Sequence, residues 1–475
     1  MNWALLSLAL PLLSAFWVLL VRRAVSETIL FATLVSLAAA LAAFYQVQSD
    51  PVQTLLLGDW TLPLAIRFEL TSLNALLMVL TATIHFLVGL YNRFSRHGSG
   101  RYSDYWPLSA VLHAALVALW LSRDLFNWYV TLELLTLVAV ALVTLSGPKA
   151  YRAALGYLVL SLIASLFYLL GVALLYGEYG VLDLDRLAAL AVDSANTRLA
   201  LLLMVLGLML KAALWPLYLW LPDAHANAPT AVSALLSALV VKGPLFILWL
   251  TLTQIAPVEF AQQLGLIFAL LGSVALLSGA WSALRTPYLK TLVAYSTVAQ
   301  LGYALITLGL LLRWQTPELA TALWLFVIAH ALAKVSAFLA AGEMQATFGS
   351  KELIAVRGAS QSMPLAMFAF AVAGGSLIGL PPSGGFLAKW ILLQPLFAEP
   401  AHWPWALAIL LGTLASAAYV FRVVALAFDR YDVETELPQT DALAQWLSLL
   451  PALVVWGLAL ISQPLMLWLS TGANP

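Results

Sequence analysis

The chain has 475 residues, of which 63% are hydrophobic and 9% are charged, and its mean hydropathy is +0.96. Because water-soluble domains are about 25% charged, this composition indicates an integral membrane protein. The formal net charge of +0, from 22 basic and 22 acidic residues, gives no indication of a nucleic-acid partner. The sequence contains no cysteine, which excludes disulfides, thiolate zinc sites and cysteine-ligated iron–sulfur clusters within it.

A transmembrane helix needs about 20 predominantly apolar residues, and the sequence predicts fourteen such helices in an all-α polytopic fold. They cover approximately residues 3–21, 28–47, 70–91, 105–122, 125–145, 153–176, 198–219, 229–251, 262–283, 291–312, 319–342, 364–394, 403–426 and 443–470. The first segment lacks the basic start and small-residue cleavage site of a signal peptide, so we expect it to be retained.

The basic residues predict an orientation, because lysine and arginine are concentrated in inner loops. If the N-terminus lies outside, thirteen of them fall in inner loops: Arg22, Arg23, Arg93, Arg96, Arg101, Lys149, Arg152, Arg285, Lys290, Lys351, Arg357, Arg422 and Arg430. Five fall in outer loops: Arg67, Arg123, Arg186, Arg198 and Arg313. We therefore expect a multi-pass protein of the bacterial cell (inner) membrane with both termini on the periplasmic or outer side.

The predicted helices form four parts: residues 1–99, 100–251, 252–426 and 427–475. The first part contains three helices and an outer loop, residues 48–69, in which Gly58-Asp59-Trp60 suggests a hairpin. The second and third parts contain five helices each, an odd number that permits two inverted repeats. The last part is an acidic inner loop, residues 427–442, followed by the final helix. That loop is either a solvated connection or a docking surface for a neighbouring membrane protein of the same complex.

Two predicted helices contain prolines beside a lysine. Lys211-Ala-Ala-Leu-Trp-Pro216 lies in the seventh helix, and Gly379-Leu-Pro381-Pro382-Ser-Gly-Gly-Phe-Leu-Ala-Lys389 lies in the twelfth. A proline removes a backbone donor and interrupts the helix, and discontinuous helices at matching places in two halves are typical of a transport path. We expect helices 7 and 12 to be discontinuous, although kinks that only aid packing are the alternative.

Charged residues inside predicted helices are the main indication of function, because an ionised side chain in lipid costs several kcal/mol. Glu133 is the single acid that we place deep in a helix, and Lys211 is its expected partner. A lysine ammonium nearby would keep such a carboxylate ionised. The pair either lies on a proton path or acts only as a structural clamp.

Three further lysines lie in predicted helices, namely Lys242, Lys334 and Lys389. A buried lysine exchanges its proton readily, whereas arginine does not, so the choice of lysine favours proton transfer over static charge. His330 lies four residues before Lys334 and therefore on the same helix face. We predict that these residues, with Glu133 and Lys211, transfer protons.

Three other residues are candidates for proton uptake or release: His113, Asp223 and His225. His113 is expected in the fourth helix, where a histidine satisfied by a neighbouring backbone group is the simpler interpretation. Asp223 and His225 are expected in a short inner loop, where His225 either exchanges protons or caps the loop. We expect no metal ion and no cofactor in this chain.

Several motifs occur in order between about residues 100 and 395. They are Asp124-Leu-Phe-Asn-Trp-Tyr-Val-Thr-Leu-Glu133, Lys211-Ala-Ala-Leu-Trp-Pro-Leu-Tyr-Leu-Trp-Leu-Pro-Asp-Ala-His225, Ala228-Pro-Thr-Ala-Val-Ser-Ala-Leu-Leu, Leu289-Lys-Thr-Leu-Val-Ala-Tyr-Ser-Thr-Val-Ala-Gln-Leu-Gly-Tyr303, His330-Ala-Leu-Ala-Lys334 and Gly379-Leu-Pro-Pro-Ser-Gly-Gly-Phe-Leu-Ala-Lys389. With them the chain resembles the antiporter-like membrane subunits shared by Mrp cation/proton antiporters and respiratory complex I.

The resemblance implies fourteen helices, two inverted five-helix repeats and a proton path at mid-membrane. It makes Glu133 and Lys211 the coupled pair, Lys242 the connecting relay, His330 and Lys334 the second half-channel, and Lys389 its terminal lysine. Within the family, Lys389 favours the D subunit of Mrp antiporters, whereas the loop around His225 favours a complex I subunit. The chain stops at Pro475 without a long lateral helix, which favours the mid-sized members.

Three functions fit this resemblance. The first is a subunit that exchanges protons for Na⁺ or K⁺ together with other membrane subunits of an Mrp complex. The second is a proton-pumping subunit of a complex I-like NADH-quinone oxidoreductase or a membrane-bound hydrogenase. The third is the membrane subunit of an inorganic-carbon uptake complex. In each case the chain is a transporter subunit in lipid and not an enzyme by itself.

Overall fold

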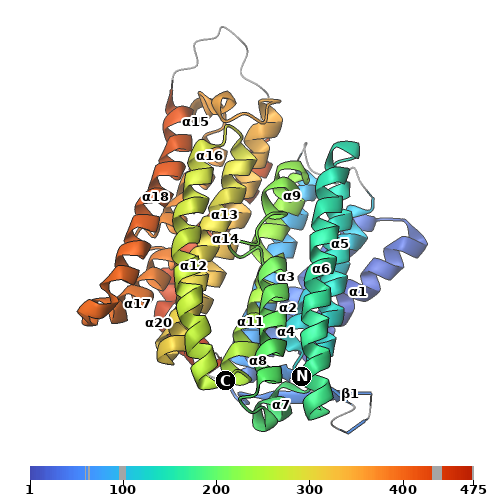
Figure 1. The fold of residues 1–475 in the computed structure, drawn as a ribbon. Helices are drawn as coiled ribbons and strands as arrows, with labels where there is room; N and C mark the ends of the chain where they lie inside the picture. Colours follow the sequence, from blue (N-terminus) through green and yellow to red (C-terminus); the bar gives the residue numbers. More distant parts are fainter. Residues whose placement is uncertain (59, 62–64, 96–102, 430–440, 473–475) are drawn as a thin grey trace.

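The computed structural model describes residues 1–58, 60–61, 65–95, 103–429 and 441–472. Within these residues, eleven helices are long and apolar enough to cross a membrane, and three shorter apolar helices accompany them. The predicted all-α polytopic fold with about fourteen transmembrane helices is confirmed. Figure 1 shows most of these helices running roughly side by side.

The N-terminal part consists of three helices and a hairpin. These are α1 (Asn2–Val21), α2 (Val25–Val47), β1 (Gln53–Leu57), β2 (Ile66–Leu70) and α3 (Ser72–Phe94). The two strands are antiparallel, with Gln53 paired with Leu70 and Leu57 with Ile66. Thr71 caps α3, since its side chain accepts a hydrogen bond from the amide of Asn74. Asp59, part of the predicted turn, lies outside the described residues.

A charged cluster fastens β2 to the neighbouring helices. Arg67 lies 2.8 Å from Asp183 and 2.6 Å from Asp185, while Arg123 donates to Glu69 at 2.8 Å. Arg67, Glu69, Arg123 and Asp183 have side chains at most 11% exposed. Since burying one unpaired charge is costly, the pairing holds the hairpin in place against the bundle.

The first set of five transmembrane segments follows. It comprises α4 (Tyr105–Leu121), α5 (Leu125–Thr144), α6 (Pro148–Tyr179), the segment with α8 (Ala195–Lys211) and α9 (Leu221–Asn227), and the segment with α10 (Thr230–Leu235), the π-helical η2 (Leu236–Val240) and α11 (Lys242–Gln254). The short helix α7 (Leu184–Leu190) connects α6 to α8. The predicted break in the seventh segment is present.

The second set also has five segments. It comprises α12 (Val258–Arg285), α13 (Leu289–Trp314), α14 (Pro317–Thr347), the segment with α16 (Pro364–Ile378) and α17 (Gly384–Ala398), and α18 (Trp403–Phe428). Short elements lie between them: η3 (Leu353–Val356), α15 (Ala359–Ser362) and η4 (Pro400–His402). Because the first set has an odd number of segments, the second starts from the opposite side of the membrane, as inverted repeats require.

The chain ends with α19 (Ala442–Gly457), η5 (Leu458–Ile461) and α20 (Ser462–Gly472). Figure 1 shows the two chain ends at the same end of the bundle as β1 and α7, while α9 and α15 lie at the opposite end. Most of the predicted acidic loop, residues 430–440, lies outside the described residues. Arg96 and Arg101 from the predicted inner loops also lie outside them.

Small residues allow α12 and α13 to pack closely. A Cβ atom added to Gly272 would lie 2.6 Å from the carbonyl oxygen of Gly302, and one added to Gly302 would lie 2.6 Å from that of Gly272. Neither glycine can therefore be enlarged without separating the helices. This contact fixes the position of α13, which carries much of the polar site described next.

Candidate functional site: buried titratable residues across both helix sets

Glu133 of α5 and Lys211 of α8 form an ion pair in the first helix set. The Nζ of Lys211 lies 2.9 Å from Oε1 of Glu133 and donates to Oγ1 of Thr136 at 3.1 Å. Ser165 of α6 donates to the same carboxylate oxygen. The side chains of Lys211 and Glu133 are 3% and 18% exposed. Each charge is thus met by the opposite charge and by hydroxyl groups, as burial requires.

The chain leaves its helical path directly after Lys211. Residues 212–220 form turns, and Pro216, which follows a cis peptide bond, lies among them. The indole N–H of Trp220 donates to the carbonyl of Leu210 at 2.9 Å and so satisfies a carbonyl near the break. The ammonium group of Lys211 is placed at a helix C-terminus, where the helix dipole favours a positive charge.

Lys242 connects the two helix sets. It begins α11, and its Nζ lies 2.9 Å from Nδ1 of His330 on α14 and donates to the carbonyl of Ser237 in η2. The sequence predicts one continuous helix here, but η2 interrupts it with a π-helical turn, a feature frequent at functional sites. Pro244 lies in the first turn of α11, where proline is tolerated.

Lys334 lies one turn after His330 on α14 but has different partners. Its Nζ donates to the carbonyl of Val293 at 3.0 Å and to Oγ of Ser296, both on α13. His330 and Lys334 therefore do not bond to each other, as a single titratable pair would. His330 faces the first helix set, whereas Lys334 faces α13.

Lys389 lies at the second helix break. Its Nζ donates to the carbonyls of Leu377 and Ile378, at 2.8 and 2.9 Å, which are the last two residues of α16. It also lies 4.0 Å from the centre of the Tyr303 ring. Both the helix C-terminus and the aromatic face favour a positive charge at this position. The predicted break at Pro381 and Pro382 is present, so Lys389 and Lys211 lie in corresponding surroundings.

Helix α13 links these positions through one polar face. Thr297 lies 3.0 Å from the hydroxyl of Ser237, and Gln300 donates to the carbonyl of Leu377 at 3.1 Å. Tyr303, three residues further, contacts Lys389. Because these residues recur every three or four positions, α13 presents hydrogen-bonding groups from the π-helical turn to the break in the twelfth segment.

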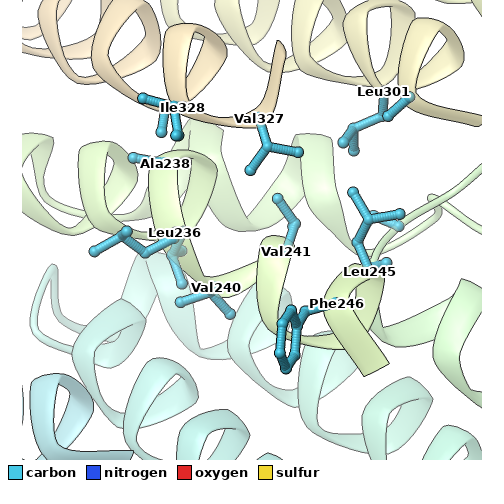
Figure 2. Packing of buried hydrophobic residues seen from close by; sticks show 14 of the residues in the cluster. Leu236, Ala238, Val240, Val241, Leu245, Phe246, Leu301, Val327 and Ile328 are labelled. Atoms are coloured by element: carbon cyan, nitrogen blue, oxygen red, sulfur yellow. The ribbon is translucent and has the colours of Figure 1, made fainter. Parts of the chain in front are cut away.

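Apolar side chains pack together at the junction of the two sets. Figure 2 shows Val327 and Ile328 of α14 on the side of Ala238 and Val241, and Leu301 of α13 near Leu245. These six side chains are at most 6% exposed. Packed aliphatic side chains exclude water from their own volume, so this part of the junction is dry.

Two candidates for proton uptake differ from expectation. His225 is not in a short loop: it lies in α9, is 0% exposed, and its ring centre is 4.7 Å from that of Phe338, on which it stacks. Neither of its ring nitrogens has a hydrogen-bond partner among the described residues. The loop interpretation was wrong because Leu221–Asn227 forms a helical turn that folds inward. Asp223, in the same helix, is exposed.

His113 does lie in the fourth segment, but its partner is not a backbone group. Its Nε2 lies 3.1 Å from Oγ of Ser36 on α2. The ring also contacts His85 of α3, with ring centres 4.8 Å apart. The expected simple histidine, satisfied by a backbone group, is therefore wrong.

Sequence reasoning missed two charged residues that are buried in transmembrane helices. Lys290, counted above as an inner-loop residue, lies in α13, is 6% exposed and donates to the carbonyl of Ala228 at 2.7 Å. Glu343 is 0% exposed and accepts from Tyr91 at 2.7 Å and from Ser95 at 3.0 Å. Glu133 is thus not the only acid buried in a transmembrane helix, because α14 continues to Thr347. Both residues lie near helix ends, where an exact boundary decides between loop and interior.

The fold and the site define a polytopic membrane protein with a series of buried titratable groups across two helix sets. Residues 122–416 match the family model described as "NADH:quinone oxidoreductase/Mrp antiporter, TM". The chain belongs to this family, and the predicted resemblance is confirmed.

Relatives of both kinds named in that description are found. NADH-quinone oxidoreductase subunit N of Desulforudis audaxviator is 34% identical, covering 90% of this chain and 85% of the relative. The D subunit of the Na⁺/H⁺ antiporter of Bacillus subtilis is 30% identical, covering 92% and 89%. A chain in the structure of the membrane-bound sulfane sulfur reductase, an archaeal respiratory membrane complex, matches with a TM-score of 0.91 at 28% identity, covering 99% and 97%.

Proposed function

We propose that the chain is a proton-translocating subunit of a multisubunit Na⁺ or K⁺/proton antiporter. The observation that carries the proposal is the series of buried titratable side chains that extends through both helix sets. Its members are Glu133, Lys211, Lys242, His330, Lys334 and Lys389. The side chain of Glu133 is 18% exposed, and the other five residues are at most 5% exposed. Intramembrane ionisable groups of this kind are characteristic of proton relays.

Each group in the series has a chemical reason to exchange a proton. Lys242 and His330 contact each other directly, and each has a protonated and a neutral form. Lys211 and Ser165 both contact the carboxylate of Glu133. If the ion pair is broken, that carboxylate becomes free to accept a proton. Water at the polar faces of α8, η2 and α13 would connect groups that do not touch.

The proposal includes the membrane setting. The chain acts as a transporter subunit, not as an enzyme, and its partners are other membrane subunits of a hetero-oligomeric complex. The relatives named above are themselves subunits, which supports this assembly. The distribution of basic residues supports termini on the periplasmic or outer side, and the described termini lie at one end of the bundle (Figure 1).

A second function has specific support. The 34% identity to NADH-quinone oxidoreductase subunit N and the similarity to a respiratory complex favour a proton pump that takes its energy from electron transfer in other chains. The buried series serves either function, because both require protons to move between the two helix sets.

Purification of the intact complex through an affinity tag on this chain distinguishes the two functions. Antiporter function predicts partners that are small membrane proteins, whereas the alternative predicts partners that contain iron–sulfur clusters. Mass spectrometry of the partners and the visible absorption spectrum of the complex provide the two readouts. Iron–sulfur absorption in the purified complex would contradict the antiporter proposal.

A further inference from the structure

His85 and His113 form a contact outside the lysine series. His85 lies near the middle of α3 and His113 at the middle of α4, and their ring centres are 4.8 Å apart. The two residues are 6% and 1% exposed. Two histidines in contact within lipid-crossing helices are unusual, because polar groups at this depth carry a free-energy cost.

The hydrogen bonds around His85 fix where its proton lies in the neutral ring. Nδ1 of His85 is 3.0 Å from the carbonyl of Thr81, which only accepts, so this nitrogen carries a proton. Nε2 of His113 is 3.1 Å from Oγ of Ser36, whose hydroxyl also lies 2.8 Å from the carbonyl of Ser7 and 2.9 Å from Oγ of Ser7. In the neutral form of His85, Nε2 is therefore a proton acceptor.

No described residue hydrogen-bonds to Nε2 of His85 or to Nδ1 of His113. A buried polar nitrogen without a partner carries a free-energy cost, and here two of them occur on adjacent rings. Water placed against these nitrogens would supply the missing hydrogen bonds. The arrangement suits a site that binds a proton reversibly better than it suits inert packing.

A polar stripe on α3 extends from this pair toward the end of the bundle that carries the chain termini. Asn74, Thr81 and His85 are spaced by seven and four residues, so they lie on one helix face. Thr81 accepts from the indole N–H of Trp120 at 3.0 Å. Asn74 lines a cavity of about 450 Å³ whose walls include Glu69 and Arg123.

The acids on helices packed against α3 lie at or near the ends of those helices. Glu27 is in the first turn of α2, Glu318 and Glu343 are near the two ends of α14, and Asp441 caps α19. A proton on either ring is thus not paired with any of these carboxylates.

We propose that His85 and His113 form a second proton-accepting site at mid-membrane, which exchanges protons through water along α3 with the end of the bundle that carries the termini. The inference rests on the proposed proton translocation. The site ends within the membrane and therefore opens no continuous leak. Each transfer moves one proton from water to a ring lone pair and then back to water, so the ring returns to its neutral form.

Nitrogen-15 NMR of histidine-labelled complex tests the site without measuring transport. Signals are assigned by their loss in His85→Gln and His113→Gln. We expect neutral rings at high pH, with His85 as the tautomer given above, and an imidazolium signal from one ring as the pH falls from roughly 9 to 5. Signals from both rings that stay neutral over this range would overturn the proposal.

Transport provides the second test, in membrane vesicles that contain the intact complex. The double variant His85→Gln/His113→Gln should lower proton movement at least about fivefold, since glutamine keeps hydrogen bonds but does not titrate. His402→Gln, which changes a histidine outside the pair, should transport normally. A double variant with the wild-type rate would overturn the inference, whereas absent transport in the wild type would instead contradict the proposed function.

Discussion

The Nζ of Lys242 lies 2.9 Å from Nδ1 of His330, and this contact joins the two five-helix sets. Lys242 belongs to the first set and His330 to the second. The same ammonium donates to the carbonyl of Ser237 in the π-helical turn. A proton that moves between the halves of the molecule therefore has a direct donor and acceptor at the boundary.

Replacing Lys242 by arginine should block that transfer. Arginine keeps the positive charge but is not deprotonated in proteins, so we expect the transport rate to fall at least about 100-fold. Lys149→Arg is the matched control, because Lys149 is exposed. Proton movement in vesicles is the measurement, and an unchanged rate in Lys242→Arg would show that Lys242 does not need to titrate.

Removing either member of the ion pair, by Glu133→Ala or Lys211→Ala, should abolish transport and leave assembly intact. The pair lies within the helix set and has no partner outside it other than Ser165 and Thr136 in the part of the chain described here. Copurification of the other subunits measures assembly, and proton movement measures function. Normal transport by a fully assembled variant would rule out a role for the pair on the path.

Lys389→Ala should impair transport more than His113→Ala. Lys389 is held by two helix-terminal carbonyls and the Tyr303 ring, whereas loss of His113 leaves His85 in place. We expect a decrease of at least about tenfold for Lys389→Ala and of about threefold or less for His113→Ala. Equal and mild effects would indicate that the second half-channel is not used.

Arg67→Ala should destabilise the protein, because it leaves the buried carboxylate of Asp183 without its closest partner. Breaking a buried pair in this way costs about 3–5 kcal/mol. The control is Arg198→Ala: its pair with Asp193 is more than one-third exposed, so solvent screens it and its loss should change the stability little. Thermal unfolding in detergent compares the two, and equal shifts in Tm would contradict the account of the hairpin.

The same cluster predicts a pH effect. Burial alone would raise the pKa of Asp185, but the hydrogen bond and charge of Arg67 outweigh it and lower this pKa below its usual value. A depressed folded-state pKa gives stability that is present above the unfolded pKa and is lost as the pH falls through the folded one. Arg67→Ala should therefore weaken the loss of thermal stability on acidification. An acid profile identical to that of the wild type would show that the pair is not coupled to Asp185.

The sequence was informative where one residue type had one compatible role. A lone glutamate and a lysine in apolar helices require a partner, which made the contact between Glu133 and Lys211 predictable. The breaks were predictable for a similar reason, since Pro216 and Pro381-Pro382 do not continue a helix.

Other parts of the site depend on geometry that no local pattern specifies. The π-helical turn at Leu236–Val240 arises in a stretch without proline or glycine, so its sequence reads as ordinary helix. The burial of His225 depends on the inward fold of α9, and that of Lys290 on the carbonyl of Ala228. The contact between His85 and His113 depends on the packing of α3 against α4, which composition and periodicity do not determine.

The most direct test is the change in pH that Na⁺ or K⁺ produces in inverted vesicles from antiporter-deficient cells that express the whole complex, with Lys211→Ala as the comparison. The account predicts cation-dependent proton movement in the wild type and none in the variant. Wild-type vesicles that ignore both cations but move protons when an electron donor is added would contradict it and assign the chain to a redox-driven pump.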